Sequence, residues 1–201
     1  MNARATTRLA LAGWLAGATV AGAETGRYFL GAQIGLFEPT GFADSFDAVY
    51  GGSLVPLGVR FEVGGPRWFA SLAAAQMEAD GERVVLVPQP VGTGVATELT
   101  LRPFRFTVAR RFRDAGAWRP YVGGGLTVLD WRESTSFETV SDISHGYHAL
   151  GGAARQRGRW RWGGEVVASR VDVGSNAGLL EQFGEDDLGG VEIAVYAGWS
   201  F

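Results

Sequence analysis

The two histidines and the groups near them are the residues that could carry out catalysis. His145 and His148 precede an alternating segment that holds Glu165 and Ser169. A hydrolase needs a nucleophile, a base and an orienting group within hydrogen-bond reach of one another. The alternation places Ser169 on an inward face and His148 on an outward face. We therefore predict no catalytic residue, and a lipid-modifying enzyme stays as the third functional hypothesis.

Metal and cofactor chemistry also lack a strong signal. Asp142, His145 and His148 have a spacing that suits zinc poorly, because structural zinc sites take four close ligands. The acidic run 185–187 could hold Ca²⁺ or Mg²⁺, although a solvated loop tip is the simpler interpretation. The chain has no cysteine, which excludes disulfides and thiolate chemistry. We predict neither a metal nor a cofactor.

The segment 191–201 shows how the chain assigns its side chains to two faces. Its odd positions are apolar, from Val191 to Phe201, and its even positions are mostly small or polar. This period of two indicates a strand with one apolar and one polar face. Seven more segments carry strand-like patterning: 27–37, 56–64, about 67–77, about 98–112, 118–132, about 147–155 and 159–171.

The fourth of these segments contains a break in its pattern. Leu99 and Leu101 share one parity, whereas Phe104 and Phe106 share the other. Pro103 lies between the two pairs and lacks the N–H that a sheet ladder uses. We therefore expect a β-bulge near Pro103.

The connections between the segments alternate strictly in length. Short links lie at 65–66, 113–117 and around 158, whereas the links 38–55, 78–97, 133–146 and 172–190 are long. Transmembrane barrels have short periplasmic turns and long extracellular loops. We predict an all-β fold, an eight-stranded antiparallel up-and-down transmembrane β-barrel over residues 24–201. Val84 to Val87 would extend one hairpin above the membrane.

The amino-terminal residues 1–23 resemble a secretory signal peptide. Arg4 and Arg8 precede an apolar run, and Ala21-Gly22-Ala23 is an A-x-A cleavage pattern. We expect Sec-type export, cleavage near Ala23 and a location in the bacterial outer membrane.

Aromatic residues gather at the expected periplasmic ends of the strands. An aromatic girdle of this kind marks the membrane–water boundary. Its expected members are Tyr28, Trp68, Trp118, Trp160, Trp199 and Phe201, with Tyr50 and Trp131 at or beyond the other end.

Two motifs resemble a known group of proteins. The run Arg119-Pro120-Tyr121-Val122-Gly123-Gly124-Gly125-Leu126 and the ending Tyr196-Ala197-Gly198-Trp199-Ser200-Phe201 are similar to small porin-like outer-membrane barrels of Gram-negative bacteria, of the OmpA transmembrane-domain-like and OmpW-like kinds. The resemblance implies recognition by the barrel-assembly machinery through Val195, Ala197, Trp199 and Phe201. It implies little about activity, because both motifs are architectural.

The inward-facing charges suggest what fills the barrel. An eight-stranded barrel is only wide enough for side chains or one small ligand. We expect an Arg–Glu network that plugs the lumen, formed by Arg60, Glu62, Arg105, Arg161, Glu165 and Glu192, with Arg111 beside it.

A structural, surface-exposed outer-membrane protein is therefore the leading hypothesis. A narrow channel or passage for ions or small hydrophobic solutes is the alternative, because many inward positions are glycine or alanine. The net charge of −3 argues against nucleic acid as a partner. The expected partners are outer-membrane lipids and lipopolysaccharide, and the expected state is a monomer.

Overall fold

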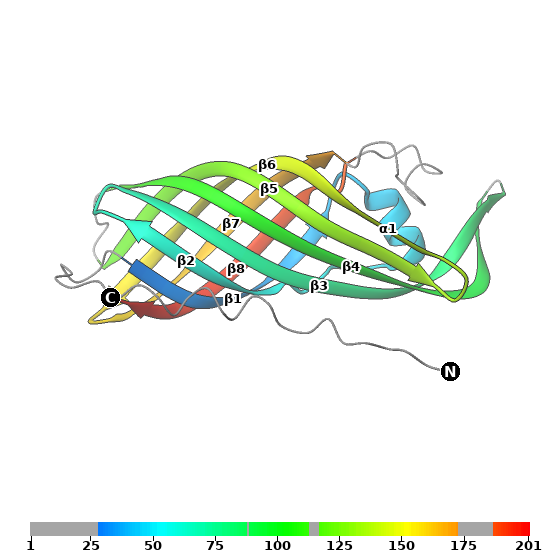
Figure 1. Ribbon diagram of the computed structural model, residues 1–201, viewed down its shortest axis with the longest axis horizontal. Coiled ribbons are helices and arrows are strands. Elements are labelled where there is room, and N and C mark those ends of the chain that lie inside the picture. Colours follow the sequence, from blue (N-terminus) through cyan, green and yellow to red (C-terminus); the bar gives the residue numbers. More distant parts are fainter. Residues whose placement is uncertain (1–27, 88, 113–116, 173–186) are drawn as a thin grey trace.

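The structure is a computed structural model that describes residues 28–87, 89–112, 117–172 and 187–201. In these residues eight antiparallel strands form one closed barrel, in which each strand pairs with the next and β8 pairs with β1 (Figure 1). The predicted fold class is confirmed. The proposed signal peptide at residues 1–23 lies outside the described residues. The strands are β1 Tyr28–Pro39, β2 Leu57–Gly64, β3 Trp68–Val87, β4 Gln89–Arg111, β5 Trp118–Thr135, β6 Thr139–Arg157, β7 Trp160–Asp172 and β8 Gly190–Ser200.

The two ends of the barrel differ. Tyr28 donates its backbone N–H to the carbonyl of Phe201 at 3.0 Å, so both described chain ends meet at one end, which we call the termini end (left in Figure 1). At the opposite end, the loop end, β3 to β6 extend far beyond the other strands. The prediction that 78–97 and 133–146 are loops is wrong, because most of these residues belong to β3, β4, β5 and β6. The extension of a hairpin at Val84 to Val87 is confirmed.

Period-two alternation positions the side chains along each strand. On β1, Leu30, Ile34 and Leu36 are exposed on the outside, whereas Phe29 and Gln33 are buried inside. The run from Tyr28 to Leu36 matches the length of about 9–11 residues that a strand needs to cross a bilayer. The outside of the termini half is therefore an apolar band.

The predicted β-bulge at Pro103 is wrong. The β4–β5 pairing runs from Thr97↔Thr135 to Arg111↔Tyr121 without a shift, and the β3–β4 register shifts only between Glu82 and Val84. Odd residues of β4 point inward on both sides of Pro103. The apolar residues change face because the surroundings change: Phe104 faces outward in the apolar band, whereas Leu101 faces the barrel interior.

A short helix fills the mouth of the loop end. Helix α1 (Ala43–Val49) lies in the connection between β1 and β2, which the sequence analysis treated as a loop. Phe42, Phe46 and Val49 are buried, and the Phe42 and Phe46 rings meet edge to face at 5.6 Å. The sequence pattern did not predict this helix, because it has only seven residues and is stabilised by the packing of its side chains against the barrel interior. No helix in the described part of the chain has the length and hydropathy to cross a membrane.

An apolar core occupies the interior below this helix, and we call it the loop-end cluster. It joins α1 and its flanks to the inward residues of β1, β3, β4, β5 and β7. Its buried members are Phe37, Phe42, Phe46, Leu54, Met77, Leu99, Leu101, Leu129, Trp131, Val171 and Leu188.

Candidate functional site: the charged interior of the barrel

The interior of the termini half is built around Arg60 of β2. Its Nε donates to Glu62 at 2.8 Å, and its Nη1 forms an ion pair with Glu165 of β7. Arg60 and Glu62 project inward because they are alternate residues of one strand. Arg60 is 1% exposed, so its charge depends on these two carboxylates.

Glu62 is the residue on which the other cations converge. Arg111 of β4 donates to its Oε2 at 2.9 Å, and Arg161 of β7 pairs with the same oxygen. We call Arg60, Glu62, Arg111, Arg161 and Glu165 the charged network. It links β2, β4 and β7 across the lumen with three guanidiniums and two carboxylates. A buried network of this kind is strongly destabilised when one partner is removed.

Aromatic rings surround these guanidiniums. Arg161 lies 3.9 Å from the ring centroid of Phe29, and Arg111 lies 4.1 Å from that of Phe69. Arg60 lies 4.9 Å from the ring centroid of Tyr196. The Tyr121 hydroxyl donates to Glu165 at 2.9 Å. Cation–π contacts of this type are strongest where water is excluded.

Inward-facing glycines make room for the two tyrosine rings. A Cβ at Gly163 would lie 2.6 Å from the Tyr196 hydroxyl, and one at Gly152 would lie 2.6 Å from the Tyr121 hydroxyl. Any larger residue would collide with ring and backbone. Gly152 and Gly163 therefore hold space that the two tyrosine side chains occupy, and they do not leave an open lumen at this level.

A second polar layer lies nearer the loop end. Arg105 of β4 pairs with Glu192 of β8, and both are buried. His148 of β6 lies between two threonine hydroxyls, with Nε2 at 2.9 Å from Thr107 and Nδ1 at 2.9 Å from Thr127.

The structure places all six residues of the predicted lumen network inside the barrel. Four of them, Arg60, Glu62, Arg161 and Glu165, meet in the charged network, and Arg105 and Glu192 form a separate pair. Sequence reasoning missed the hydroxyl partners Thr107, Thr127, Tyr121 and Tyr196. Their inward parity was readable, but which strands would bring them together depends on the register.

The predicted outward orientation of His148 is wrong. His148 is buried and shares the inner face with Ser169, its cross-strand partner. The ring nitrogens of His148 bond to threonines, whereas the Ser169 hydroxyl bonds to the backbone of Gly190 at 3.3 Å. The described residues therefore show no hydrogen bond between this serine and histidine. His145 faces outward, and Asp142 does not join the two histidines.

The expected girdle residues surround the termini end. Trp160 and Trp199 meet edge to face at 4.9 Å, and Tyr28 stacks on Phe201 at 6.0 Å. The expectation for the other end is wrong for Trp131, which is 3% exposed and belongs to the loop-end cluster. Val195, Ala197, Trp199 and Phe201, the residues expected to form an assembly signal, are exposed on the outer side of β8 and at its end.

Outside the apolar band, Tyr50 joins the helix connection to the barrel wall. Its hydroxyl donates to Glu133 Oε1 at 3.3 Å and lies 3.4 Å from the Thr97 hydroxyl, which also bonds Glu133. Burial raises the pKa of the Glu133 carboxyl and that of the Tyr50 phenol. We call this pair the clasp: it ties the segment after α1 to β5 at the barrel mouth, and its burial favours the protonated form of Glu133.

Metal ligands do not cluster in the described part of the chain. No group of three or more histidine or acidic side chains there is arranged to hold an ion. Of the acidic run 185–187, only Asp187 lies within the described residues, and it accepts the backbone N–H groups of Val171 and Gly189. The other two residues of the run lie outside the described residues, so the hypothesis that the run binds Ca²⁺ or Mg²⁺ stays a prediction.

Comparisons with known proteins agree with the geometry. No family model matches the chain, and no curated protein matches its sequence. Among solved structures, the chain superposes on the Neisserial surface protein A (NspA) with a TM-score of 0.61 and 10% identity, covering 89% of this chain and 100% of that one. The chain has the fold of the small outer-membrane β-barrels.

Two further structures support the same fold. The outer membrane protein OprG of Pseudomonas aeruginosa matches with a TM-score of 0.59 and 12% identity, covering 88% of this chain and 96% of OprG. The attachment invasion locus protein Ail of Yersinia pestis matches with a TM-score of 0.54 and 12% identity, covering 88% of this chain and 98% of Ail. At sequence identities of 10–12%, these matches show that the fold is shared and say nothing about a shared activity.

Proposed function

We propose that the protein is an integral outer-membrane barrel whose lumen is closed and whose loop end faces the cell exterior. The apolar band around the termini half supports membrane insertion, because a closed barrel satisfies its backbone hydrogen bonds within hydrocarbon. Short turns lie at the termini end, as on the periplasmic side of such barrels. Residues 1–23 would direct export and be removed near Ala23.

One observation carries the closed-lumen proposal: the interior is filled at successive levels by different chemistry. The charged network fills the termini half, the Arg105–Glu192 pair and His148 follow, and the loop-end cluster with α1 fills the mouth. A conducting path would have to cross all of these layers. The proposed role is thus structural and surface-related, with lipids and lipopolysaccharide as surroundings and the assembly machinery as the partner in biogenesis.

Planar-bilayer recording tests the closed lumen. The purified protein, refolded and shown to be inserted by resistance to protease, should give no reproducible current steps. Discrete steps whose size changes in Glu165→Gln would contradict the proposal and establish the narrow channel for ions or small solutes. Membrane fractionation tests the location separately, because an outer-membrane protein sediments with that membrane and is extracted only by detergent.

The absence of an enzymatic role is part of the same proposal. It is supported by the separate hydrogen bonds of His148 and Ser169. Purified protein should not deacylate lipid A. Activity that disappears in His148→Ala would overturn this part while leaving the barrel itself intact.

The loop end does not favour binding of sulfated polysaccharides. Ail was solved in complex with the heparin analogue sucrose octasulfate. The exposed charged side chains at the loop end of this barrel are mostly carboxylates, including Glu38, Asp44, Asp47, Glu78, Asp80, Glu82, Glu98 and Glu138. These would repel a polyanion, so we do not extend that ligand to this protein.

A further inference from the structure

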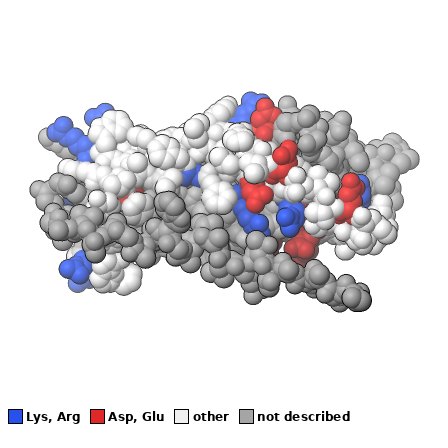
Figure 2. Space-filling view, viewed as in Figure 1, with Lys and Arg blue, Asp and Glu red and all other residues white. Residues whose placement is uncertain are grey.

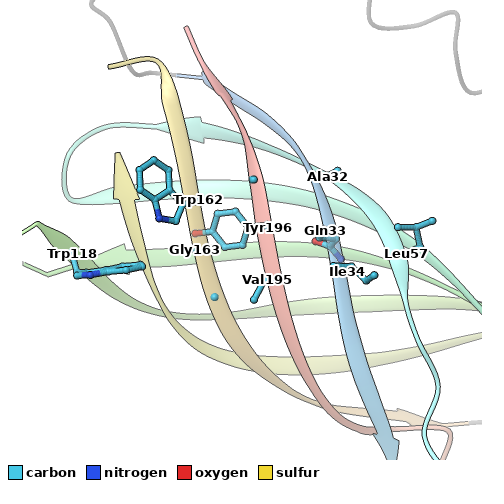
Figure 3. A pocket seen from close by; sticks show the side chains of 11 residues that line it. Ala32, Gln33, Ile34, Leu57, Trp118, Trp162, Gly163, Val195 and Tyr196 are labelled. Carbon is cyan, nitrogen blue, oxygen red and sulfur yellow. The ribbon is translucent and has the colours of Figure 1, made fainter. Parts of the chain in front are cut away.

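A groove with an almost wholly apolar lining lies on the outer wall of the barrel. It has a volume of about 710 Å³ and lies over β1, β8 and β7. Ala32, Ala197 and Gly164 form its floor, since all three are outward-facing and small. In Figure 3 the indoles of Trp118 and Trp162 stand at one side of the groove and Leu57 at the other.

The floor follows from the register. Ala32 pairs directly with Ala197, and Ala197 pairs with Trp162 on the other side. Gly164 is two residues along β7 from Trp162 and therefore on the same face. These two small residues lie side by side, with Trp162 beyond Ala197 and Val59 beyond Ala32, and they leave a depression between the larger side chains. Hydrocarbon is the medium that such a wall meets.

A cation lies beside the groove. Arg155 of β6 is the cross-strand partner of both Trp118 and Trp162, so it lies between the two indoles. Its guanidinium is 5.9 Å from the Trp162 ring centroid. The described contacts give it no carboxylate partner, and its side chain is exposed. A guanidinium held against an indole at the membrane boundary is suited to a phosphate.

The wider charge distribution favours an anionic headgroup at this end. Figure 2 shows arginines at the termini end of this face and most carboxylates toward the loop end. The exposed charged side chains at the termini end, within the described residues, are all arginines: Arg67, Arg110, Arg119, Arg155, Arg157 and Arg159. The chain contains no lysine at all.

We propose that this groove binds one anionic glycerophospholipid of the periplasmic leaflet, with an acyl chain over Ala32, Ala197 and Gly164 and the phosphate at Arg155. The proposal rests on the proposed membrane function, because only an inserted barrel presents this wall to lipid. A zwitterionic lipid would fill the groove equally well but would gain less from the surrounding arginines.

Lipid retention tests the proposal. The full barrel is placed in nanodiscs of equimolar phosphatidylglycerol and phosphatidylethanolamine, and native mass spectrometry then counts the lipid that stays bound. The wild type should retain phosphatidylglycerol preferentially. Arg155→Gln should lower that preference about fivefold, as expected for loss of one cation near an anionic surface. Arg110→Gln is the matched control, because Arg110 also lies 5.9 Å from an indole, that of Trp68, but away from the groove.

A larger side chain in the groove tests the second part of the proposal, that an acyl chain lies over the groove floor. A Cβ at Gly164 would meet nothing closer than 3.5 Å, so Gly164→Leu fits the barrel and should reduce retention of both lipids. Gly151→Leu, outward on β6 with its nearest contact at 3.9 Å, is the control and should retain lipid like the wild type. If Gly164→Leu does not assemble, Ala32→Leu fills the same floor.

The outcomes separate the two proposals. Equal loss of preference in Arg155→Gln and Arg110→Gln, or unchanged retention in the groove-filled variant, would overturn the lipid site alone. Failure of the wild-type barrel to enter nanodiscs would instead overturn the proposed membrane function.

Discussion

The two halves of this barrel differ in what their interior and exterior carry. In the termini half, apolar side chains point outward, and the interior holds the charged network packed among aromatic and aliphatic side chains; in the loop half, carboxylates point outward and the loop-end cluster lies inside. The same strands form both halves, and β4 changes over at Pro103 without a change of register. The comparison shows that one wall can meet hydrocarbon at one level and water at the next. Each face takes the polarity that its surroundings require.

The largest effect should come from breaking the charged network. Glu165→Ala leaves Arg60 buried with only Glu62, and removes the nearer of the two acceptors of the Tyr121 hydroxyl. We expect the unfolding free energy to fall by about 3–5 kcal/mol, measured by urea titration in detergent or lipid. Arg102→Ala is the control: its pair with Asp130 is 3.6 Å long and 43% exposed on both sides, and such surface pairs contribute about 0–1 kcal/mol. Similar losses in both variants would show that burial does not distinguish these pairs.

A cavity in the loop-end cluster should have a slightly smaller effect. Leu101 is 1% exposed, and Leu101→Ala should lower the unfolding free energy by about 2–5 kcal/mol. Leu101→Met keeps the volume and should lose less than about 1.5 kcal/mol. If Leu101→Ala were neutral, the loop half would not be packed as a core, and the comparison between the halves would fail.

The adjacent glycines Gly163 and Gly164 allow the inner and outer faces of one strand to be compared. Gly163→Ala would force the Tyr196 ring and the Ala153 carbonyl to move, since both lie 2.6 to 2.7 Å from the new Cβ. We expect a loss of about 1–3 kcal/mol in the same titration, as for other overpacked cores. Gly164→Ala points outward, meets its nearest atom at 3.5 Å, and should be nearly neutral. Equal effects in the two variants would argue against the close contact between Gly163 and the Tyr196 ring.

The smallest expected effect is the pH response of the clasp at the barrel mouth. The pKa of Glu133 is raised by burial, so the folded state binds its proton more tightly than the unfolded state does. This group should therefore add stability as pH falls from above its raised pKa toward about 4.5, with no further gain below that pH. The protection factors of the α1 amides, which are corrected for the intrinsic pH dependence of exchange, should rise over this range in the wild type and stay constant in Glu133→Gln.

The fold was predictable from the sequence because the signals are local. Alternation on β2, such as Leu57 and Val59 against Arg60 and Glu62, assigns faces without knowledge of the partner strands. The inward charges followed from the same parity, and the girdle at the termini end followed from the position of the aromatic residues at the strand ends. The order of short and long links then indicated an up-and-down barrel.

The remaining features depend on what surrounds a strand rather than on its pattern. The parity change at Pro103 resembles a bulge only if one environment surrounds the whole strand, whereas β4 has an apolar exterior on one side of Pro103 and an apolar interior on the other. Trp131 was assigned to a girdle for the same reason, although it lies in a part of β5 whose interior is apolar. The contacts of His148 with Thr107 and Thr127 join three strands, and only the register reveals them.

The seam between β1 and β8 determines how such a chain must mature. Eleven residue pairs, from Phe29↔Ser200 to Pro39↔Gly190, join the strand made first to the strand made last. Until that seam forms, two rows of backbone donors and acceptors have no partner, and contacts this distant in sequence are slow to find. For as long as these two edges stay apart, each is an unpaired strand on which another chain could add and aggregation could begin.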